Sequence, residues 1–227
     1  MKTLIYIPII HSMVDLGSIA EDVAKRAVRD LGEEIWKEHG KTIDGFWDSV
    51  VNYFDSIDVS GMKIYQDGMV AEGEVGKQIV GDISKTGSKN YMLLSNLLKR
   101  GALLAKTEDF GLVKKERDRI VEVTKALNTA TKLVAYFKYK FTKNILLQKR
   151  DMYVVKRICE TLNHGETGIL FMGAYHNIIP KLRREIQITE IKKVEKIKDY
   201  QKLLLCHNRN KEKFKKLSEY LISPIAN

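Results

Sequence analysis

The fold of this chain is predicted best from one stretch, Gly168-Ile169-Leu170-Phe171-Met172-Gly173-Ala174-Tyr175-His176. Its apolar run, 169–172, lies between two glycines and is typical of a strand buried on both faces. Gly173 permits a tight turn where the strand ends. His176 follows in the region where open α/β sheets bind their ligands, so it is a candidate for chemistry. Taken alone, the same histidine fits a structural hydrogen bond to a loop.

Further apolar runs predict the other strands of the sheet. They lie at residues 4–10, 62–66, 102–105 and 186–194. Helical periodicity separates them, at 19–40 with Gly40 as the stop, at 42–54 with Thr42 as the cap, and at 88–99. Strands that alternate with helices predict an α/β protein with a mostly parallel central sheet.

The second half of the chain carries two long helical segments. Residues 110–165 predict a helical insertion, in which the apolar residues from Ile120 to Phe141 recur in steps of three and four. This seam suits either a helical pair within the chain or a homodimer. Arg150-Asp151 is expected to open a further helix, and 195–227 to form a basic helical C-terminal segment. We therefore expect a single α/β domain over residues 1–227.

Composition limits the classes of protein that are compatible with this chain. The net charge is +10 over 227 residues, and residues 181–216 carry 13 Lys and Arg against 5 Asp and Glu. No apolar run approaches the roughly 18 residues of a membrane span. Cys159 and Cys206 lack CxxC spacing, which excludes a cysteine-rich zinc site and favours a reducing, cytoplasmic location. The glycine-rich section 68–87 contains neither G-x-x-x-x-G-K-[S/T] nor G-x-G-x-x-G.

Polar side chains that can do chemistry follow four of the predicted strands. They are His11 after the first, Asp67 after the second, Glu108 after the third and His176 after the fourth. Parallel neighbouring strands would bring these groups to one edge of the sheet. Structural interpretations are open as well, because Asp67-Gly68 suits a turn and Thr107 or Asp109 suits a helix cap.

The predicted cluster suggests two kinds of hydrolytic site. His11, Asp67, Glu108 and His176 together could bind a divalent metal that activates water. Without a metal, a histidine could act as general base while a carboxylate orients it, and a helix that begins near His176 would keep its imidazole neutral. Arg150 could bind an anionic group or stabilise developing negative charge.

Several of these residues resemble a known superfamily. The pair Arg150-Asp151 and the segment Gly173-Ala174-Tyr175-His176 are similar to motifs of the superfamily that contains TraB/pheromone-shutdown proteins, Tiki proteases, erythromycin esterases and ChaN-like proteins. The resemblance implies an α/β core with a His/carboxylate site to which His11 and Asp67 also belong. It does not fix a reaction, since it covers metal-dependent peptidases and esterases. This chain departs from the pattern in having Pro8-Ile9-Ile10 before His11, and Asp67 where a glutamate is usual.

Our first hypothesis is a hydrolase that acts on a small molecule or a peptide. The second is a non-catalytic protein whose basic C-terminal segment contacts nucleic acid or an acidic partner, although aromatic residues are not interleaved there as stacking platforms. The third is a homodimer formed through the helical seam, with a vestigial site.

Overall fold

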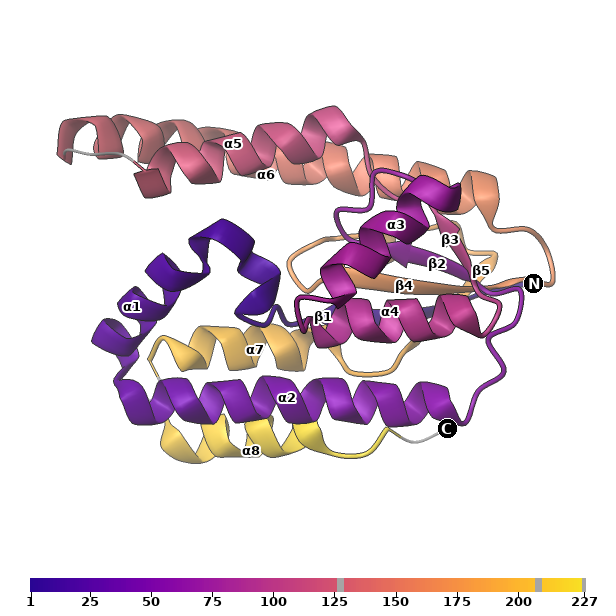
Figure 1. Ribbon diagram of the computed structural model, residues 1–227, viewed down its shortest axis with the longest axis horizontal. Helices are drawn as coiled ribbons and strands as arrows, with labels where there is room; N and C mark the ends of the chain where they lie inside the picture. The colour runs from indigo at the N-terminus through magenta and orange to yellow at the C-terminus, as the bar shows by residue number, and fades with distance from the viewer. Residues whose placement is uncertain (126–128, 207–209, 226–227) are drawn as a thin grey trace.

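A computed structural model describes residues 1–125, 129–206 and 210–225. Within them, parallel strands form one five-stranded sheet in the order β3-β2-β4-β1-β5, which confirms the predicted α/β fold (Figure 1). The strands are β1 (Lys2–Ile9), β2 (Lys63–Gln66), β3 (Leu103–Ala105), β4 (Thr167–Gly173) and β5 (Ile186–Glu190).

Strand β4 occupies the centre of the sheet, as its continuous apolar run predicts. It pairs with β1 from Thr3↔Thr167 to Ile9↔Gly173 and with β2 from Lys63↔Gly168 to Gln66↔Phe171. Because all of these pairs are parallel, the carboxyl ends of β1, β2 and β4 lie at one edge of the sheet. We call this edge the carboxyl edge.

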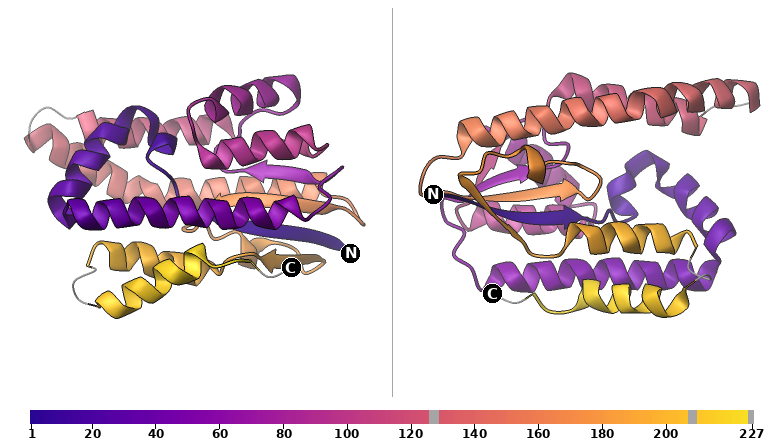
Figure 2. Two further views of the ribbon diagram at one scale, coloured as in Figure 1. Left: turned by 60° about the horizontal axis from the view of Figure 1, so that its bottom comes forward. Right: turned by 180° about the vertical axis from the view of Figure 1, so that it is seen from behind.

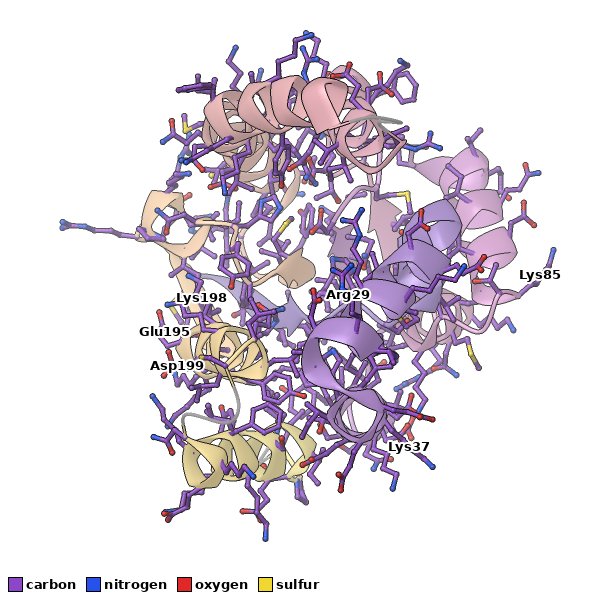
Figure 3. All side chains as sticks on the ribbon, turned by 90° about the vertical axis from the view of Figure 1, so that its left-hand side faces the viewer. Arg29, Lys37, Lys85, Glu195, Lys198 and Asp199 are labelled. Atoms are coloured by element: carbon purple, nitrogen blue, oxygen red, sulfur yellow. The ribbon has the colours of Figure 1, made fainter. Side chains whose placement is uncertain are left out.

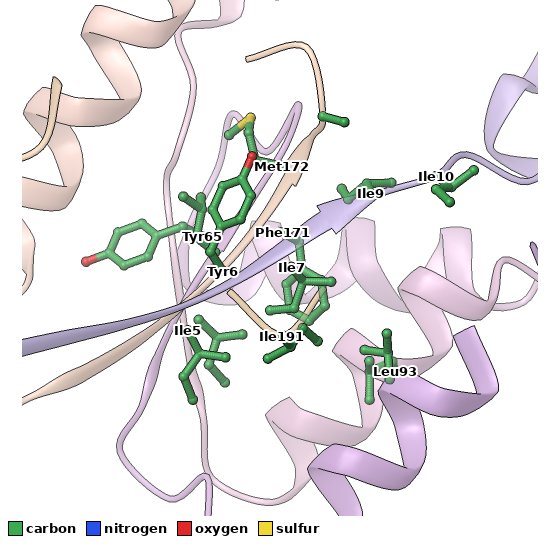
Figure 4. Packing of buried hydrophobic residues seen from close by; sticks show 14 of the residues in the cluster. Ile5, Tyr6, Ile7, Ile9, Ile10, Tyr65, Leu93, Phe171, Met172 and Ile191 are labelled. Atoms are coloured by element: carbon green, nitrogen blue, oxygen red, sulfur yellow. The ribbon is translucent and has the colours of Figure 1, made fainter. Parts of the chain in front are cut away.

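Helices cover both faces of the sheet. Figure 4 shows Ile7, Phe171 and Leu93 on one face, and Tyr6, Tyr65 and Met172 on the other. The first face packs against α2 (Glu33–Asp55) and α4 (Lys89–Lys99), with ring centroids of Phe54 and Phe171 6.2 Å apart. The second face is covered by the C-terminal half of α6 (Thr129–Thr161) (Figure 2).

The helices after β1 break at a different glycine from the one predicted. A short 3-10 segment, η1 (Val14–Ile19), leads into α1 (Ala20–Leu31), and Gly32 at φ +88° separates α1 from α2. Gly40 and Thr42 are therefore not a stop and a cap but lie inside α2, where the Thr42 hydroxyl donates to the Glu38 carbonyl at 3.0 Å. The predicted boundary at Gly40 was wrong because the helix continues to pack beyond it.

The glycine-rich section contains a helix that the sequence analysis missed, α3 (Gly73–Ser84). Gly76 lies so close to β3 that a Cβ atom there would come within 2.8 Å of Leu104 Cδ2. This glycine thus permits close packing of α3 on the sheet, although glycine lowers helix propensity. Ser88 caps α4 by accepting from the Tyr91 backbone N–H at 3.3 Å.

The predicted helical pair consists of α5 (Phe110–Lys125) and α6, which pack against each other. They project beyond the carboxyl edge as a hairpin (Figure 1), while the middle of the seam, residues 126–128, lies outside the described residues. Helix α6 runs unbroken through Arg150-Asp151, so the expected helix start at this pair was wrong.

The basic C-terminal segment forms α7 (Val194–Leu204) and α8 (Lys211–Ile222), which follow η2 (Ile179–Lys181) and β5. Tyr200 of α7 stacks on Phe214 of α8, with 5.2 Å between ring centroids, and both rings are buried. Acidic and basic side chains, among them Glu195, Lys198 and Asp199, lie together on the outer surface of α7 (Figure 3). In the described part of the chain, no helix is long and apolar enough to span a membrane.

Candidate functional site

The four predicted site residues all lie near the carboxyl edge, each after a different strand. Asp67 directly follows β2, and its backbone N–H donates to the Phe171 carbonyl at 2.8 Å. His176 follows β4 through a turn in which its N–H donates to Gly173 O at 3.0 Å. Asp67 and His176 line one cavity with His11, whereas Glu108 is fully buried.

Arg150 is the centre of a buried charge cluster. Its Nε donates to Glu108 Oε2 at 2.8 Å, and one terminal nitrogen contacts Glu108 Oε1. The same nitrogen donates to Asp67 Oδ1 at 2.6 Å, while the other contacts Glu116 Oε2 of α5. The Arg150 side chain is only 10% exposed. The guanidinium therefore holds three carboxylates from three separate elements.

Backbone hydrogen bonds fix Glu108 in its place below Arg150. The N–H groups of Thr107 and Glu108 both donate to the Met69 carbonyl at 2.9 Å. The Thr107 hydroxyl accepts from the Gln66 N–H at 3.0 Å, which ties the end of β3 to β2. Thr107 is therefore a tether between strands and not the helix cap that its position after β3 also suggests.

His176 lies between two carboxylates. Its Nδ1–H donates to Asp151 Oδ1 at 2.7 Å, and its Nε2 lies 3.6 Å from Asp67 Oδ2. The other oxygen of Asp151 accepts from the Asn177 N–H at 3.0 Å and from Lys181 Nζ at 2.6 Å. The imidazole is thus oriented from one side and faces the cavity residue Asp67 from the other.

Adjacent residues of α6 serve the two halves of this site. Successive side chains of an α-helix point about 100° apart, so Arg150 and Asp151 reach different partners. Arg150 binds Asp67 and Glu108, whereas Asp151 binds His176 and Lys181. Because the helix is unbroken at this point, two adjacent residues can bind both groups of partners.

The charges around His176 favour its protonated form. Burial opposes a charge on the ring, but the hydrogen bond to Asp151 and the charge of Asp67 outweigh it and raise the pKa of His176. The expectation of a neutral imidazole was wrong, because the predicted helix start is only the three-residue η2 and two carboxylates face the ring.

The acidic residues respond to the same cluster in opposite directions. Burial works against ionisation of Asp67, but the charges of His176 and Arg150 lower its pKa to about 2. Burial raises the pKa of Glu108, and the contact with Arg150 opposes that rise. Asp67 is therefore an ionised carboxylate, and it lies beside an imidazole whose pKa is raised.

The carboxyl edge and the α5–α6 hairpin enclose a cavity of about 850 Å³, here called the edge cavity. His11 and His176 both line it, together with Asp67 and Arg150. His11 is exposed, and its charge also contributes to the low pKa of Asp67. The structure thus brings the two predicted histidines to one cavity.

The possible ligand atoms are spaced as in a metal site, but most of the carboxylate oxygens already have hydrogen-bond partners. Ligand atoms of Asp67, Glu108 and His176 lie within 4.8 Å of one another, and His11 is outside this group. Both oxygens of Glu108 and one of Asp67 already bind the Arg150 guanidinium, which carries its own positive charge. A divalent cation would have to displace Arg150 and deprotonate His176, so these residues do not fit a metal as they stand.

Sequence reasoning left two contributors out of the site. Glu116 completes the charge cluster from α5, and Lys181 holds Asp151 from η2. Both lie in helical or turn segments rich in charged residues, where no spacing distinguishes them from surface residues. The sequence analysis connected Asp151 with the site only through the resemblance, in which it stands next to Arg150.

Comparisons of this chain with protein-family models, curated proteins and solved structures gave no match. The resemblance to the TraB, Tiki and erythromycin esterase superfamily stays a prediction.

Proposed function

We propose that this protein is a hydrolase in which His176 donates a proton to the leaving group and Asp67 accepts one from water. The arrangement Asp151–His176–Asp67 at the wall of the edge cavity is the observation that carries this proposal. Asp151 holds Nδ1, which leaves Nε2 to exchange a proton with substrate.

The resting protonation states suit these roles. Because Asp151 and Asp67 raise the pKa of His176, the protonated imidazole is favoured. Asp67 is ionised under the same conditions. His176 therefore begins the reaction as an acid, and Asp67 begins it as a base.

The proposed reaction consumes one water and regenerates the site. Water attacks the carbonyl carbon of an ester or amide while Asp67 Oδ2 takes a proton from it. The bond to the leaving group then breaks, and the electron pair stays on the leaving atom, which receives the proton of His176 Nε2. Asp67 finally returns its proton to His176, across the 3.6 Å that separates them.

Loss of the imidazolium charge assists the base. The charge of His176 is a main cause of the low pKa of Asp67. Once His176 has given up its proton, this charge disappears and the pKa of Asp67 rises, so Asp67 holds the proton from water more readily. The two residues act as one coupled unit.

Arg150 has a positioning role in this scheme. Its contact with Asp67 Oδ1 turns Oδ2 towards His176. With Glu108 and Glu116 also bound, Arg150 holds the carboxylate in place and is not used to bind an anionic substrate.

The test is hydrolysis of 4-nitrophenyl acetate, 4-nitrophenyl butyrate and a set of peptide 4-nitroanilides. We expect His176→Gln to lower kcat/KM by about 100-fold or more. His164→Gln is the matched control, because His164 is exposed beyond the end of α6 and should leave the rate unchanged. Equal rates for the two variants, or no turnover by the unmodified protein, would contradict the proposal.

The pH profile distinguishes an acid from a base. If His176 acts as an acid, kcat/KM falls as pH rises through its pKa. Asp151→Asn removes a group that raises this pKa, so the fall should move to lower pH. A rate that instead increases through the same pH range would assign His176 the role of base.

A further inference from the structure

The outer side of α6 carries exposed apolar side chains. Phe141, Ile145 and Met152 are 74%, 54% and 60% exposed. They are separated by four and seven residues, which correspond to about one and two turns of an α-helix, so the three side chains lie along one face. We call this face the α6 stripe. Large apolar side chains that gather on one exposed face are typical of a surface that binds a partner.

The α6 stripe is separate from the edge cavity. Tyr139 and Leu147 of the same helix line that cavity, and each lies two residues from a member of the stripe, Phe141 or Ile145. Residues two positions apart point about 200° apart on an α-helix, so the stripe faces away from the cavity. Helix α6 itself lies along one long side of the molecule (Figure 2).

Exposed lysines lie beside the stripe without acidic partners. Lys138 and Lys149 each lie within one turn of its apolar side chains. Residues 123–150 contain no Asp or Glu, and within the described part of the chain neither ammonium group forms an ion pair. Helix α5 differs, because its Lys114 pairs with Asp118 at 2.7 Å. The outer side of α6 is therefore both apolar and cationic.

This combination selects the chemistry of the partner. A second copy of the chain would bring like charges together across a twofold interface. Nucleic acid would satisfy the lysines through its phosphates but would leave the apolar side chains uncovered. A bilayer of anionic phospholipid covers both kinds of side chain, since acyl chains surround the apolar groups and head groups contact the ammonium groups. A helix that lies in the plane of the bilayer surface does not need the length of a membrane span.

We infer that the α6 stripe binds the surface of an anionic phospholipid bilayer. Phe141, Ile145 and Met152 enter the boundary between head groups and acyl chains, and Lys138 and Lys149 contact the lipid phosphates. The five residues lie outside the lining of the edge cavity. Bilayer binding is therefore independent of the proposed hydrolysis, and either can fail while the other holds.

The test is co-sedimentation of the whole chain with two kinds of vesicle. One consists of equal parts of phosphatidylcholine and phosphatidylglycerol, and the other of phosphatidylcholine alone. We expect the protein to bind the mixed vesicles about tenfold or more tightly, because only these attract the lysines. Added salt should weaken this preference.

Two matched pairs of variants locate the contact. Met152→Gln and Lys149→Gln should each weaken binding to the mixed vesicles about fivefold. Met92→Gln and Lys99→Gln should leave it unchanged, because these residues are also exposed but lie on α4, which covers the opposite face of the sheet. Thermal unfolding of each variant shows whether a loss of binding reflects a loss of fold.

Other results would overturn the inference. One is equal binding to the two kinds of vesicle, or binding to neither. Another is a loss of binding in Lys149→Gln but not in Met152→Gln, which would mean that the surface attracts any polyanion, nucleic acid included, through charge alone. A dimer of the unmodified protein that dissociates in Met152→Gln, measured by sedimentation velocity, would instead assign the stripe to a second copy.

Discussion

Two buried histidines lie in different regions of this molecule, and their pKa values are shifted in opposite directions. His176 lies at the carboxyl edge, and His39 lies between α2 and α7, where its Nδ1 is 2.8 Å from the Tyr200 hydroxyl. Each is 8% exposed. Burial lowers the pKa of His39 to about 4, whereas carboxylates raise the pKa of His176.

The difference shows what separates the buried charge cluster at the carboxyl edge from an uncharged packed interior. Burial alone removes the charge from an imidazole, and a hydrogen bond to a neutral phenol does not restore it. At the carboxyl edge, Asp151 and Asp67 restore the charge, and Arg150 and Lys181 keep these carboxylates ionised. Such a buried network is costly to maintain, and three of its members, Asp67, Arg150 and His176, line the edge cavity.

Removal of Arg150 should have the largest effect on the carboxyl edge. Arg150→Met leaves Asp67, Glu108 and Glu116 without their shared cation, and we expect a loss of about 3–5 kcal/mol in the free energy of unfolding. The measurement is urea denaturation at pH 7. Arg157→Met lies on the same helix, and its partner Glu72 is 55% exposed, so it should cost about 1 kcal/mol. Equal losses would show that the cluster is no more than a set of surface ion pairs.

The two histidines should contribute to the pH dependence of the unfolding free energy with opposite signs. The unfolded chain protonates His39 near pH 6.5, but the folded protein does so only near 4, so stability falls by about 3 kcal/mol as pH drops through this window. His176 has the opposite sign, because its folded pKa is raised. Its stabilising contribution is complete below the unfolded pKa and is lost as pH rises through the folded one.

Difference curves isolate these contributions from other titrating groups. Unfolding free energies between pH 4 and 8 would be compared for the unmodified protein, His39→Gln and His176→Gln. Subtraction should give slopes of opposite sign for the two variants. Slopes of the same sign would refute the contrast between the two regions.

The smallest effect is expected in the basic C-terminal segment. Lys213 of α8 pairs with Asp199 at 3.1 Å, but the two side chains are 52% and 43% exposed. Lys213→Ala should change stability by less than about 1 kcal/mol at low salt, and by still less when salt is added. A larger loss, measured by thermal unfolding, would mean that this region depends on its charges as the carboxyl edge does. Binding of nucleic acid by this segment stays a prediction that a salt-dependent binding assay can test.

The parts of the fold that depend on local pattern could be predicted from the sequence. The apolar run of β4 predicts a central strand, and the parallel sheet then brings the residues after each strand to one edge. Helix boundaries could not be predicted in the same way. Gly40 lies inside α2, and Gly76 inside α3, because packing against neighbouring elements outweighs the low helix propensity of glycine.

The sequence analysis named some members of the candidate site but not its chemistry. Asp67, Glu108 and His176 do come together, yet their roles depend on where the guanidinium of Arg150 lies between them. That position follows from the unbroken course of α6, which the sequence analysis divided at Arg150. The charge of His176 could not be read from the sequence either, since it depends on Asp151, 25 residues earlier in the chain.

Helix α6 also has a mechanical consequence. Its 33 residues span about 50 Å, and its C-terminal third is fixed to the sheet by contacts such as Tyr65–Thr161. Arg150 lies near the part of the helix that is fixed to the sheet, and the N-terminal end of α6 at Thr129 lies far from it. A given tilt of the helix would therefore displace Arg150 much less than Thr129. The geometry of α6 thus places the charge cluster where movement of the helix would disturb it least.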